Sequence, residues 1–266
     1  MIDGNLRREI EEKREYIKKT PINGALAKAK KVKKALAKEA TCHSFRIEYP
    51  DLALRYKSLK GSKAKREFKE TLERTKENLE QAWRFALKTY EGEITEEIIK
   101  GISGRIDPDL LCEDEINYRK DNARVLGSLY IPPRPEKISR EMYSMINGLN
   151  ALVDPIEKAL MSHFHLARIH PFVDTNGRTA RTMQNTILYS EGYVPSIIHE
   201  GERLVYFNLL ESAVAGYREK DEDIVTSPEE DVFYNFLASK INMGLDEVVD
   251  SIGRYNKGKI KDKRLI

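Results

Sequence analysis

The chain has 266 residues, of which 40% are hydrophobic and 33% are charged, and its formal net charge at pH 7 is +3. This length and balance predict a globular protein with a sizeable core, either one domain with an N-terminal extension or two packed helical lobes. No run of 18 apolar residues is present, and no apolar segment follows the charges of residues 1–16. We therefore expect neither a membrane span nor a secretory leader.

Helical periodicity dominates the chain, with one short exception. Apolar spacing predicts helices over residues 23–40, 62–90, 95–102, 139–149, 154–169, 178–190, 202–217 and 228–250. Residues 123–131 are instead β-branched and aromatic and run into a proline-rich stretch, which favours a short hairpin or an edge strand. The expected fold class is all-α, mainly helical, with one small β element.

Two further features of the sequence bear on compartment and partners. Cys42 and Cys112 are the only cysteines, so reduced thiols and a cytoplasmic location are expected. Six lysines crowd residues 28–38, and a solvated helix face explains them better than a nucleic-acid arm, because no aromatic residues interleave with them. We therefore expect neither nucleic acid nor a membrane as a partner.

Zinc is not expected from the sequence. No HExxH or CxxC spacing is present, so a structural zinc site is not predicted. His43 and His199 are far apart in the sequence and are interpreted as solvated or core histidines.

The segment from His170 to Arg181 reads HPFVDTNGRTAR and combines the groups that phosphate transfer needs. A loop that leads into a helix N-terminus can bind anions, because backbone N–H groups and the helix dipole point at the ligand. Arg178 and Arg181 are three residues apart and can clamp one polyphosphate. Asp174 offers a hard oxygen ligand for Mg²⁺, and His170 has a pKa range suited to a general base. One such residue alone is usually structural, but the ordered set is far less frequent by chance.

This ordered set resembles the catalytic loop of the Fic family, which reads HPF, any residue, Asp or Glu, then GNGR, two residues and Arg. The similarity extends over roughly residues 107–241, through Tyr118-Arg119, Val125-Leu126-Gly127, Ile131-Pro132-Pro133 and Arg203-Leu204-Val205-Tyr206. It implies a helical Fic domain at 107–245 with a small β-hairpin flap. A helical region would precede it at 1–106, and a tail would follow at 246–266.

By this resemblance, the chain is a protein adenylyltransferase that moves AMP from ATP to a Ser, Thr or Tyr hydroxyl of a target protein. His170 would be the catalytic base, and Asp174 would hold Mg²⁺. The phosphates of the nucleotide would be bound by Thr175, Asn176, Gly177, Arg178 and Arg181. Its base would be bound by Tyr206 and Phe207. The target segment would dock by strand addition on Val125, Leu126, Gly127 and Ile131.

An upstream segment, Ser44-Phe45-Arg46-Ile47-Glu48, resembles the family's inhibitory pattern of Ser or Thr, three residues and Glu. The resemblance implies that Glu48 pairs with Arg181 and denies it to the γ-phosphate of ATP. The alternative is an ordinary glutamate at a helix end, since the pattern has only two fixed positions. Tyr49 stands where the family usually has Gly or Asn.

Two departures from the family pattern leave the donor and the activity open. Thr175 replaces the first glycine of GNG, and a β-branched residue resists positive φ, so an altered anion site is expected. Val214 stands where many adenylylating members carry an asparagine. The alternatives are another nucleotide or phosphate-containing donor, or a catalytically impaired binding or regulatory module. De-modification and a homodimer also stay open.

Overall fold

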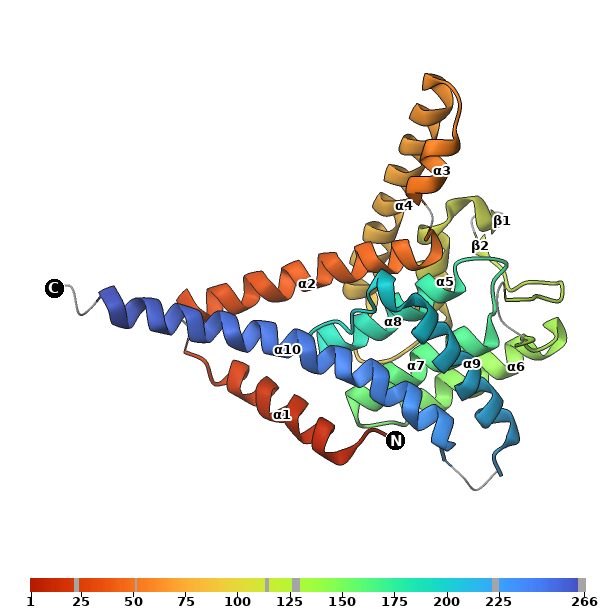
Figure 1. Ribbon diagram of the computed structural model, residues 1–266. Helices are drawn as coiled ribbons and strands as arrows, with labels where there is room; N and C mark the ends of the chain where they lie inside the picture. The colour runs from red at the N-terminus through yellow and green to blue at the C-terminus, as the bar shows by residue number, and fades with distance from the viewer. Residues whose placement is uncertain (22–23, 51, 113–114, 126–129, 222–224, 263–266) are drawn as a thin grey trace.

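The computed structural model describes residues 1–21, 24–50, 52–112, 115–125, 130–221 and 225–262, and these are mainly α-helical (Figure 1). The helices are α1 (Gly4–Lys18), α2 (Gly24–Glu48), α3 (Leu52–Ser58), α4 (Ser62–Thr89), α5 (Glu96–Ile106), α6 (Pro135–Asn150), α7 (Pro155–Ile169), α8 (Asn176–Ser190), α9 (Arg203–Glu219) and α10 (Pro228–Asp262). Short 3₁₀ turns lie at η1 (Pro108–Leu110) and η2 (Glu200–Glu202). Within this described part, no helix is long and apolar enough to cross a membrane. The predicted helical class is confirmed.

Local sequence signals set several helix starts. The side chains of Asp3, Thr95 and Asp154 accept backbone hydrogen bonds at the N-termini of α1, α5 and α7. Pro135 and Pro155 occupy the first turns of α6 and α7, where a missing N–H costs nothing. These signals explain why the predicted starts of the later helices fall within a few residues of the observed ones.

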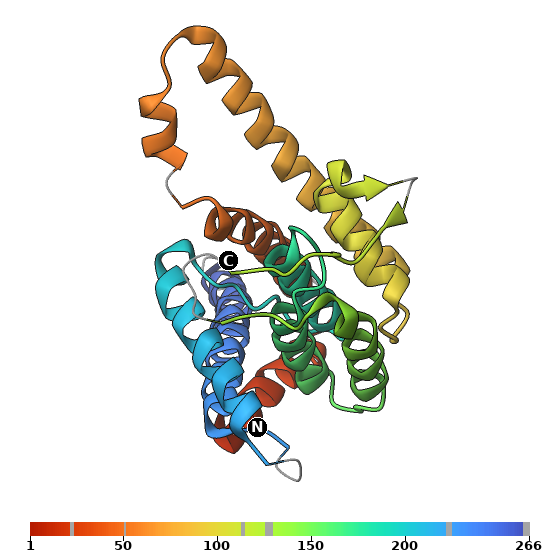
Figure 2. The same ribbon diagram turned by 90° about the vertical axis from the view of Figure 1, so that its right-hand side faces the viewer.

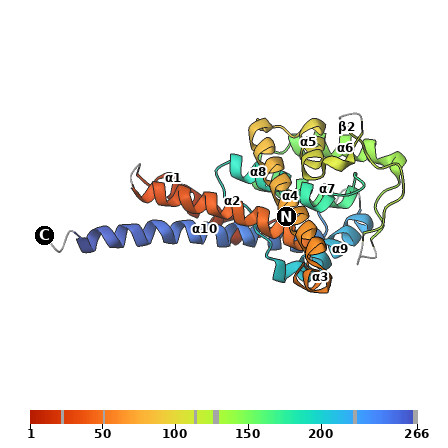
Figure 3. The ribbon, with the colours of Figure 1, turned by 90° about the horizontal axis from the view of Figure 1, so that it is seen from above.

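Helices α7 and α8 form the centre of the core and pack against each other more extensively than any other pair. Helix α5 covers α8, α6 covers α7, and α10 packs on α9 and α7. The long helices α2 and α10 run side by side, with α1 along α10 (Figures 1 and 3). The loop between α7 and α8 is thus anchored at both ends by helices of the core.

Helix α3 and the first part of α4 project from the core as an arm (Figure 2). Only the later part of α4 packs on α2, α5 and α8, and its buried residues are Leu79, Ala82 and Ala86. Neither α1 nor α3 was predicted from apolar spacing. Helix α2 continues to Glu48, and residues 246–262 extend α10 without a break, so the expected tail begins inside a helix.

The β element lies earlier than predicted. Strands β1 (Leu111–Cys112) and β2 (Glu115–Ile116) form an antiparallel two-stranded ladder. The described parts of the predicted hairpin, residues 123–125 and 130–131, have no regular secondary structure, and residues 126–129 lie outside the described part. The prediction of a strand there is wrong for the described residues. The backbone there is held by arginine side chains instead, since Arg218 donates to the carbonyl of Ile131.

Candidate active site

The loop between α7 and α8 is bounded by two residues in the left-handed region. His170 ends α7 with φ 52° and ψ 57°, and Thr175 precedes α8 with φ 72°. Across the described residues, these are the only non-glycine residues with positive φ. Such conformations cost about 1–3 kcal/mol each and cluster at functional sites. The surrounding contacts must therefore hold the loop in place.

Asn176 and Arg119 provide those contacts. The side-chain amide of Asn176 accepts a hydrogen bond from the N–H of Phe172 and donates one to the carbonyl of Phe172, both at 2.8 Å. The buried guanidinium of Arg119 donates from Nε to the carbonyl of His170 at 2.8 Å. The N–H of Arg119 also donates to the carbonyl of Pro171 at 2.9 Å. The Asn176 side chain is thus used to brace the loop, which leaves its backbone N–H for the predicted phosphate contact.

His170 is suited to accept a proton. Burial lowers the pKa of its ring, and Arg119 lowers it further, while a backbone contact with Ala167 and the carboxylates of Glu48 and Asp174 oppose the shift. The net shift is below the ordinary value of 6.5, so the imidazole is neutral at pH 7. A neutral ring at the mouth of the loop is the form that a general base requires.

The N-terminus of α8 presents an anion site. The side chain of Thr175 makes no capping hydrogen bond, and the first intrahelical backbone bond there is from Thr179 to Thr175. The backbone N–H groups of residues 176–178 are therefore without intrahelical partners, as at any helix start. The Arg178 guanidinium is buried beside them and lies 3.0 Å from Asp174 Oδ1. Positive charge and free donors converge at this point.

Thr175 points away from that site. Its hydroxyl lies 2.5 Å from the hydroxyl of Ser103 on α5, and both residues are buried. The altered anion site stays a prediction, and the backbone at Thr175 takes positive φ despite the β-branched side chain. The Ser103 contact explains this, because it supports a conformation that threonine resists. Ser103 was not identified from the sequence, since nothing in its neighbourhood resembles a motif.

Arg181, the second arginine of α8, is held by the end of α2. Its Nε donates to Ser44 Oγ at 2.9 Å, and its Nη2 donates to the Ser44 carbonyl at 3.1 Å and to Glu48 Oε1 at 2.6 Å. Burial by itself lowers the pKa of Arg181, but Glu48 and Tyr206 outweigh it, so the net pKa is raised and the group is charged. The predicted contact between Glu48 and Arg181 is present.

Glu48 also lies against the start of α8. A methyl group added at Gly177 would come within 2.6 Å of Glu48 Oε1 and 3.1 Å of Arg181 Nη1. In the described part of the chain, that Nη1 is a buried donor without a hydrogen-bond partner. The carboxylate therefore sits at the junction of the helix N-terminus and Arg181, and one guanidinium nitrogen is still unused there.

Asp174 meets the basic requirement of a Mg²⁺ ligand. Its side chain is 61% exposed, and Oδ1 takes both of its contacts, from the Thr175 N–H and from Arg178. Mg²⁺ in phosphate-transfer sites uses one or two carboxylates together with substrate phosphates. One exposed carboxylate beside an anion site fits that pattern.

The two predicted base-binding residues differ in placement. Tyr206 is buried, and its hydroxyl lies 2.9 Å from Nε2 of His163, whose pKa burial lowers to about 3. Tyr206 as placed belongs to the core and is not available to stack on a base. Phe207 is only partly buried, beneath the Arg203 guanidinium, so the base-binding prediction rests on Phe207. Val214, at the position of the family's asparagine, is buried.

The predicted flap is described only at its ends. Val125 is partly buried and Ile131 is 57% exposed, while Leu126 and Gly127 lie outside the described residues. Arg119 donates to the carbonyls of His170 and Pro133, and so joins this stretch to the loop. The docking role stays a prediction.

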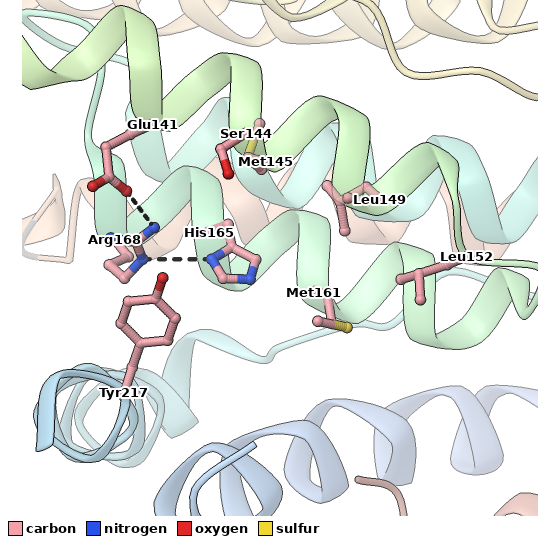
Figure 4. A pocket seen from close by; sticks show the side chains of 10 residues that line it. Glu141, Ser144, Met145, Leu149, Leu152, Met161, His165, Arg168 and Tyr217 are labelled. Atoms are coloured by element: carbon pink, nitrogen blue, oxygen red, sulfur yellow. Dashed lines mark hydrogen bonds and ion pairs between the residues drawn. The ribbon is translucent and has the colours of Figure 1, made fainter. Parts of the chain in front are cut away.

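A separate pocket of about 190 Å³ lies between α6, α7 and α9 (Figure 4). In its wall, Arg168 bonds to Glu141 at 2.9 Å and lies over the Tyr217 ring. His165 accepts a 3.4 Å hydrogen bond from the same arginine. None of the loop residues lines this pocket, so the candidate site is the anion site at α8.

The sequence of residues 92–188 matches the Fic/DOC family. This segment, which includes the loop between α7 and α8, is similar to that family. The match starts before residue 107, so α5 falls within the family segment, whereas the domain boundaries themselves stay predictions. The chain is 37% identical over 124 residues to the protein adenylyltransferase Fic of Culex quinquefasciatus, which covers 45% of this chain and 24% of that protein. The chain thus spans about a quarter of the length of this curated relative.

Two solved structures share the fold of this chain. A Fic-domain-containing signaling protein from Bacteroides thetaiotaomicron aligns with a TM-score of 0.69 and 22% identity, over 94% of this chain and 97% of that chain. Fic-1 from C. elegans aligns with a TM-score of 0.69 and 20% identity, over 94% and 72%. At these identities the similarity establishes the fold, and it covers the N-terminal helices as well as the core.

Proposed function

We propose that this chain is an autoinhibited protein adenylyltransferase that transfers AMP from ATP to a side-chain hydroxyl of a target protein. One observation carries the proposal: a neutral histidine, an exposed carboxylate and two buried arginines converge at an uncapped helix N-terminus. The name of the curated relatives, protein adenylyltransferase, supports the same reaction.

The chemistry follows from the placement of the groups. A ring nitrogen of His170 takes the proton of the target hydroxyl, and the hydroxyl oxygen forms a bond to the α-phosphorus. The bond from that phosphorus to the bridging oxygen breaks, and pyrophosphate leaves. The N-terminus of α8 and Arg178 stabilise charge on the phosphates in their fixed positions. Asp174 is the residue that would hold Mg²⁺, which neutralises phosphate charge when bound.

The inhibitory segment Ser44–Glu48, here called the brake, acts through Arg181. In this proposal, the unpaired Nη1 and the Nη2 now bonded to Glu48 are the donors that would reach the γ-phosphate. A carboxylate on the same guanidinium competes directly with that phosphate, because both accept hydrogen bonds from arginine. Loss of the Glu48 contact would free the guanidinium for ATP.

The remaining parts of the proposal are less specific. ATP is the proposed donor, a Ser, Thr or Tyr hydroxyl of a protein is the acceptor, and the cytoplasm is the proposed location. Strand addition of the target next to Val125 and Ile131 is consistent with the backbone there, which has no regular secondary structure. The oligomeric state is not part of the proposal.

Labelled nucleotides test the proposal directly. Wild type and Glu48→Gly are incubated with Mg²⁺ and each of ATP, GTP, CTP and UTP, and self-modification is read by intact mass. We expect the mass of one AMP to be added from ATP, faster in Glu48→Gly, and no addition in a Glu48→Gly/His170→Ala control. Binding of nucleotide without transfer in any variant would instead support the impaired binding module.

A further inference from the structure

Two residues of α2 meet a third residue that is distant in the sequence. Glu39 and His43 lie one turn apart on α2, and His199 comes from the segment between α8 and α9. Each offers one ligand atom, and the three atoms lie within 4.8 Å of one another. The interpretation of His43 and His199 as unrelated histidines is therefore wrong: 156 positions separate them, and their rings are in contact.

We propose that Glu39, His43 and His199 form a site for a divalent transition-metal ion, Zn²⁺, which ties α2 to the core. His43 Nε2 lies 3.2 Å from His199 Nδ1 and 3.6 Å from Glu39 Oε1. A tetrahedral ion with bonds of about 2.0–2.1 Å keeps its ligand atoms about 3.3–3.4 Å apart. These two separations are close to that spacing, and the third is at most 4.8 Å, so side-chain movements can complete three corners of the tetrahedron.

The fourth corner is available to water. A cavity of about 30 Å³, lined in part by Glu39 and His199, adjoins the group. A cavity needs about 10–15 Å³ of such space to hold one water molecule, so this one is large enough. Two imidazoles, one carboxylate and a water are the ligand set of many zinc sites, and imidazole selects Zn²⁺ over Mg²⁺ or Ca²⁺.

The charges around the site favour a cation. Glu39 contributes one negative charge, and its side chain is 44% exposed. The nearby cations are each paired with a carboxylate: Arg46 lies 3.2 Å from Glu200, and Lys240 is bonded to Glu202. Little positive charge is thus left to oppose the ion.

Metal binding requires one local change. The backbone N–H of Glu200 now donates to Nδ1 of His43 at 3.3 Å, so the ring proton is on Nε2. An ion on Nε2 moves that proton to Nδ1, and the long hydrogen bond from Glu200 is given up. The proposal therefore includes a displacement of the Glu200 amide at the start of η2.

The site lies on the same helix as the proposed brake. Glu39 and His43 come directly before Ser44 and Glu48, so an ion fixed to His199 restrains the end of α2 against the core. Arg203 already ties this end of α2 through a 2.7 Å bond from its Nε to the Ile47 carbonyl. The regulatory consequence, that Zn²⁺ holds Glu48 on Arg181 and slows transfer, depends on the proposed function, whereas the site itself does not.

The test uses the full chain without a histidine tag, stripped of metal and titrated with ZnCl₂ against a chromophoric chelator. We expect one Zn²⁺ to bind wild type, and we expect His43→Gln, His199→Gln and Glu39→Gln each to lose at least about tenfold in affinity. Residues that merely orient ligands already cost 10–100-fold, so direct ligands should cost no less. Glu73→Gln, which removes an equal charge from the exposed arm, is the matched control and should bind as wild type does.

Hydrogen exchange tests the restraint on α2 independently of any transfer reaction. At Zn²⁺ a hundredfold above its dissociation constant, opening of the end of α2 should become about a hundredfold rarer, and amide exchange at residues 44–48 should slow accordingly in wild type but not in His199→Gln. No binding, or binding unchanged in both histidine variants, overturns the site. Binding that is lost in the variants without slower exchange overturns the restraint. If transfer is absent but these results hold, only the proposed function fails.

Discussion

The loop between α7 and α8 and the end of α2 meet at Arg181 but are held in different ways. The loop is fixed by buried side chains close to it in space, with Asn176, Arg119 and Ser103 supporting both left-handed residues. The end of α2 is held to α8 by Ser44 and Glu48, and Glu48 is 30% exposed. In the proposed function, a firmly held loop beside a partly exposed Glu48 contact is what reversible inhibition needs.

The largest loss of transfer rate should come from a substitution in the loop between α7 and α8. His170→Ala removes the proposed base at the mouth of the loop, and transfer should fall by about 10²–10⁴-fold. Nucleotide binding, measured by calorimetry, should be nearly unchanged because the anion site is intact. A transfer rate equal to that of the parent would refute the assigned base.

Asp174→Ala should abolish the stimulation of transfer by Mg²⁺. Its carboxylate is exposed, so the variant should fold with the melting temperature of wild type within a few degrees. Rates measured over a Mg²⁺ titration provide the check. Activity that still rises with Mg²⁺ would place the ligand elsewhere.

Glu48→Gly tests the contact between the end of α2 and Arg181. A hydrogen bond to a charged group contributes about 1.5–3 kcal/mol, so affinity for ATP should rise roughly ten- to a hundredfold. AMP has no γ-phosphate to reach Arg181, so its affinity should stay within about twofold of wild type. Equal gains for both nucleotides would mean that Glu48 blocks the site in general and does not compete for Arg181 alone.

The pH dependence should reflect the lowered pKa of His170. The base must be neutral, and its pKa lies below 6.5, so transfer by Glu48→Gly should persist as pH falls through 6.5 and decline only below that. Single-turnover rates between pH 5 and 8 measure this limb. An acid limb centred above pH 6.5 would contradict the assignment.

The smallest effect should be that of Thr175→Gly. Glycine relieves the positive φ, and the Ser103 hydrogen bond is lost, so the two changes nearly cancel. We expect the free energy of unfolding within about 1 kcal/mol of wild type and nucleotide affinity within about threefold. Ser103→Ala should cost about 1–3 kcal/mol in wild type, because it leaves a buried hydroxyl unpaired, but less in the Thr175→Gly background. Urea unfolding of wild type, the two single variants and the double variant gives the coupling free energy between Ser103 and Thr175.

The sequence predicted those parts whose signals are local. The loop from His170 to Arg181 is a continuous motif, and its flanking helices have clear apolar periodicity, so both were found. The contact of Glu48 with Arg181 was predicted through resemblance, because no local signal joins positions 133 apart. The meeting of His43 with His199 was missed for the same reason.

Other errors have physical causes in tertiary packing. Tyr206 looked like a ligand contact, yet its hydroxyl has a buried partner in His163. The β-branched run at 123–131 suggested a strand, but the described ends of this run have no regular secondary structure. Thr175 was expected to resist positive φ, yet it adopts φ 72°, and the Ser103 hydroxyl that contacts it comes from another helix.

The connection between α2 and the projecting arm has a mechanical consequence. Only residues 49–51 join Glu48 to Leu52, the first residue of α3. A chain of that length can reach at most roughly 14 Å between the two Cα atoms. The linker between α2 and α3 is therefore short. Any movement of α3 beyond that reach must displace Glu48 as well, and so move the Glu48 carboxylate away from Arg181.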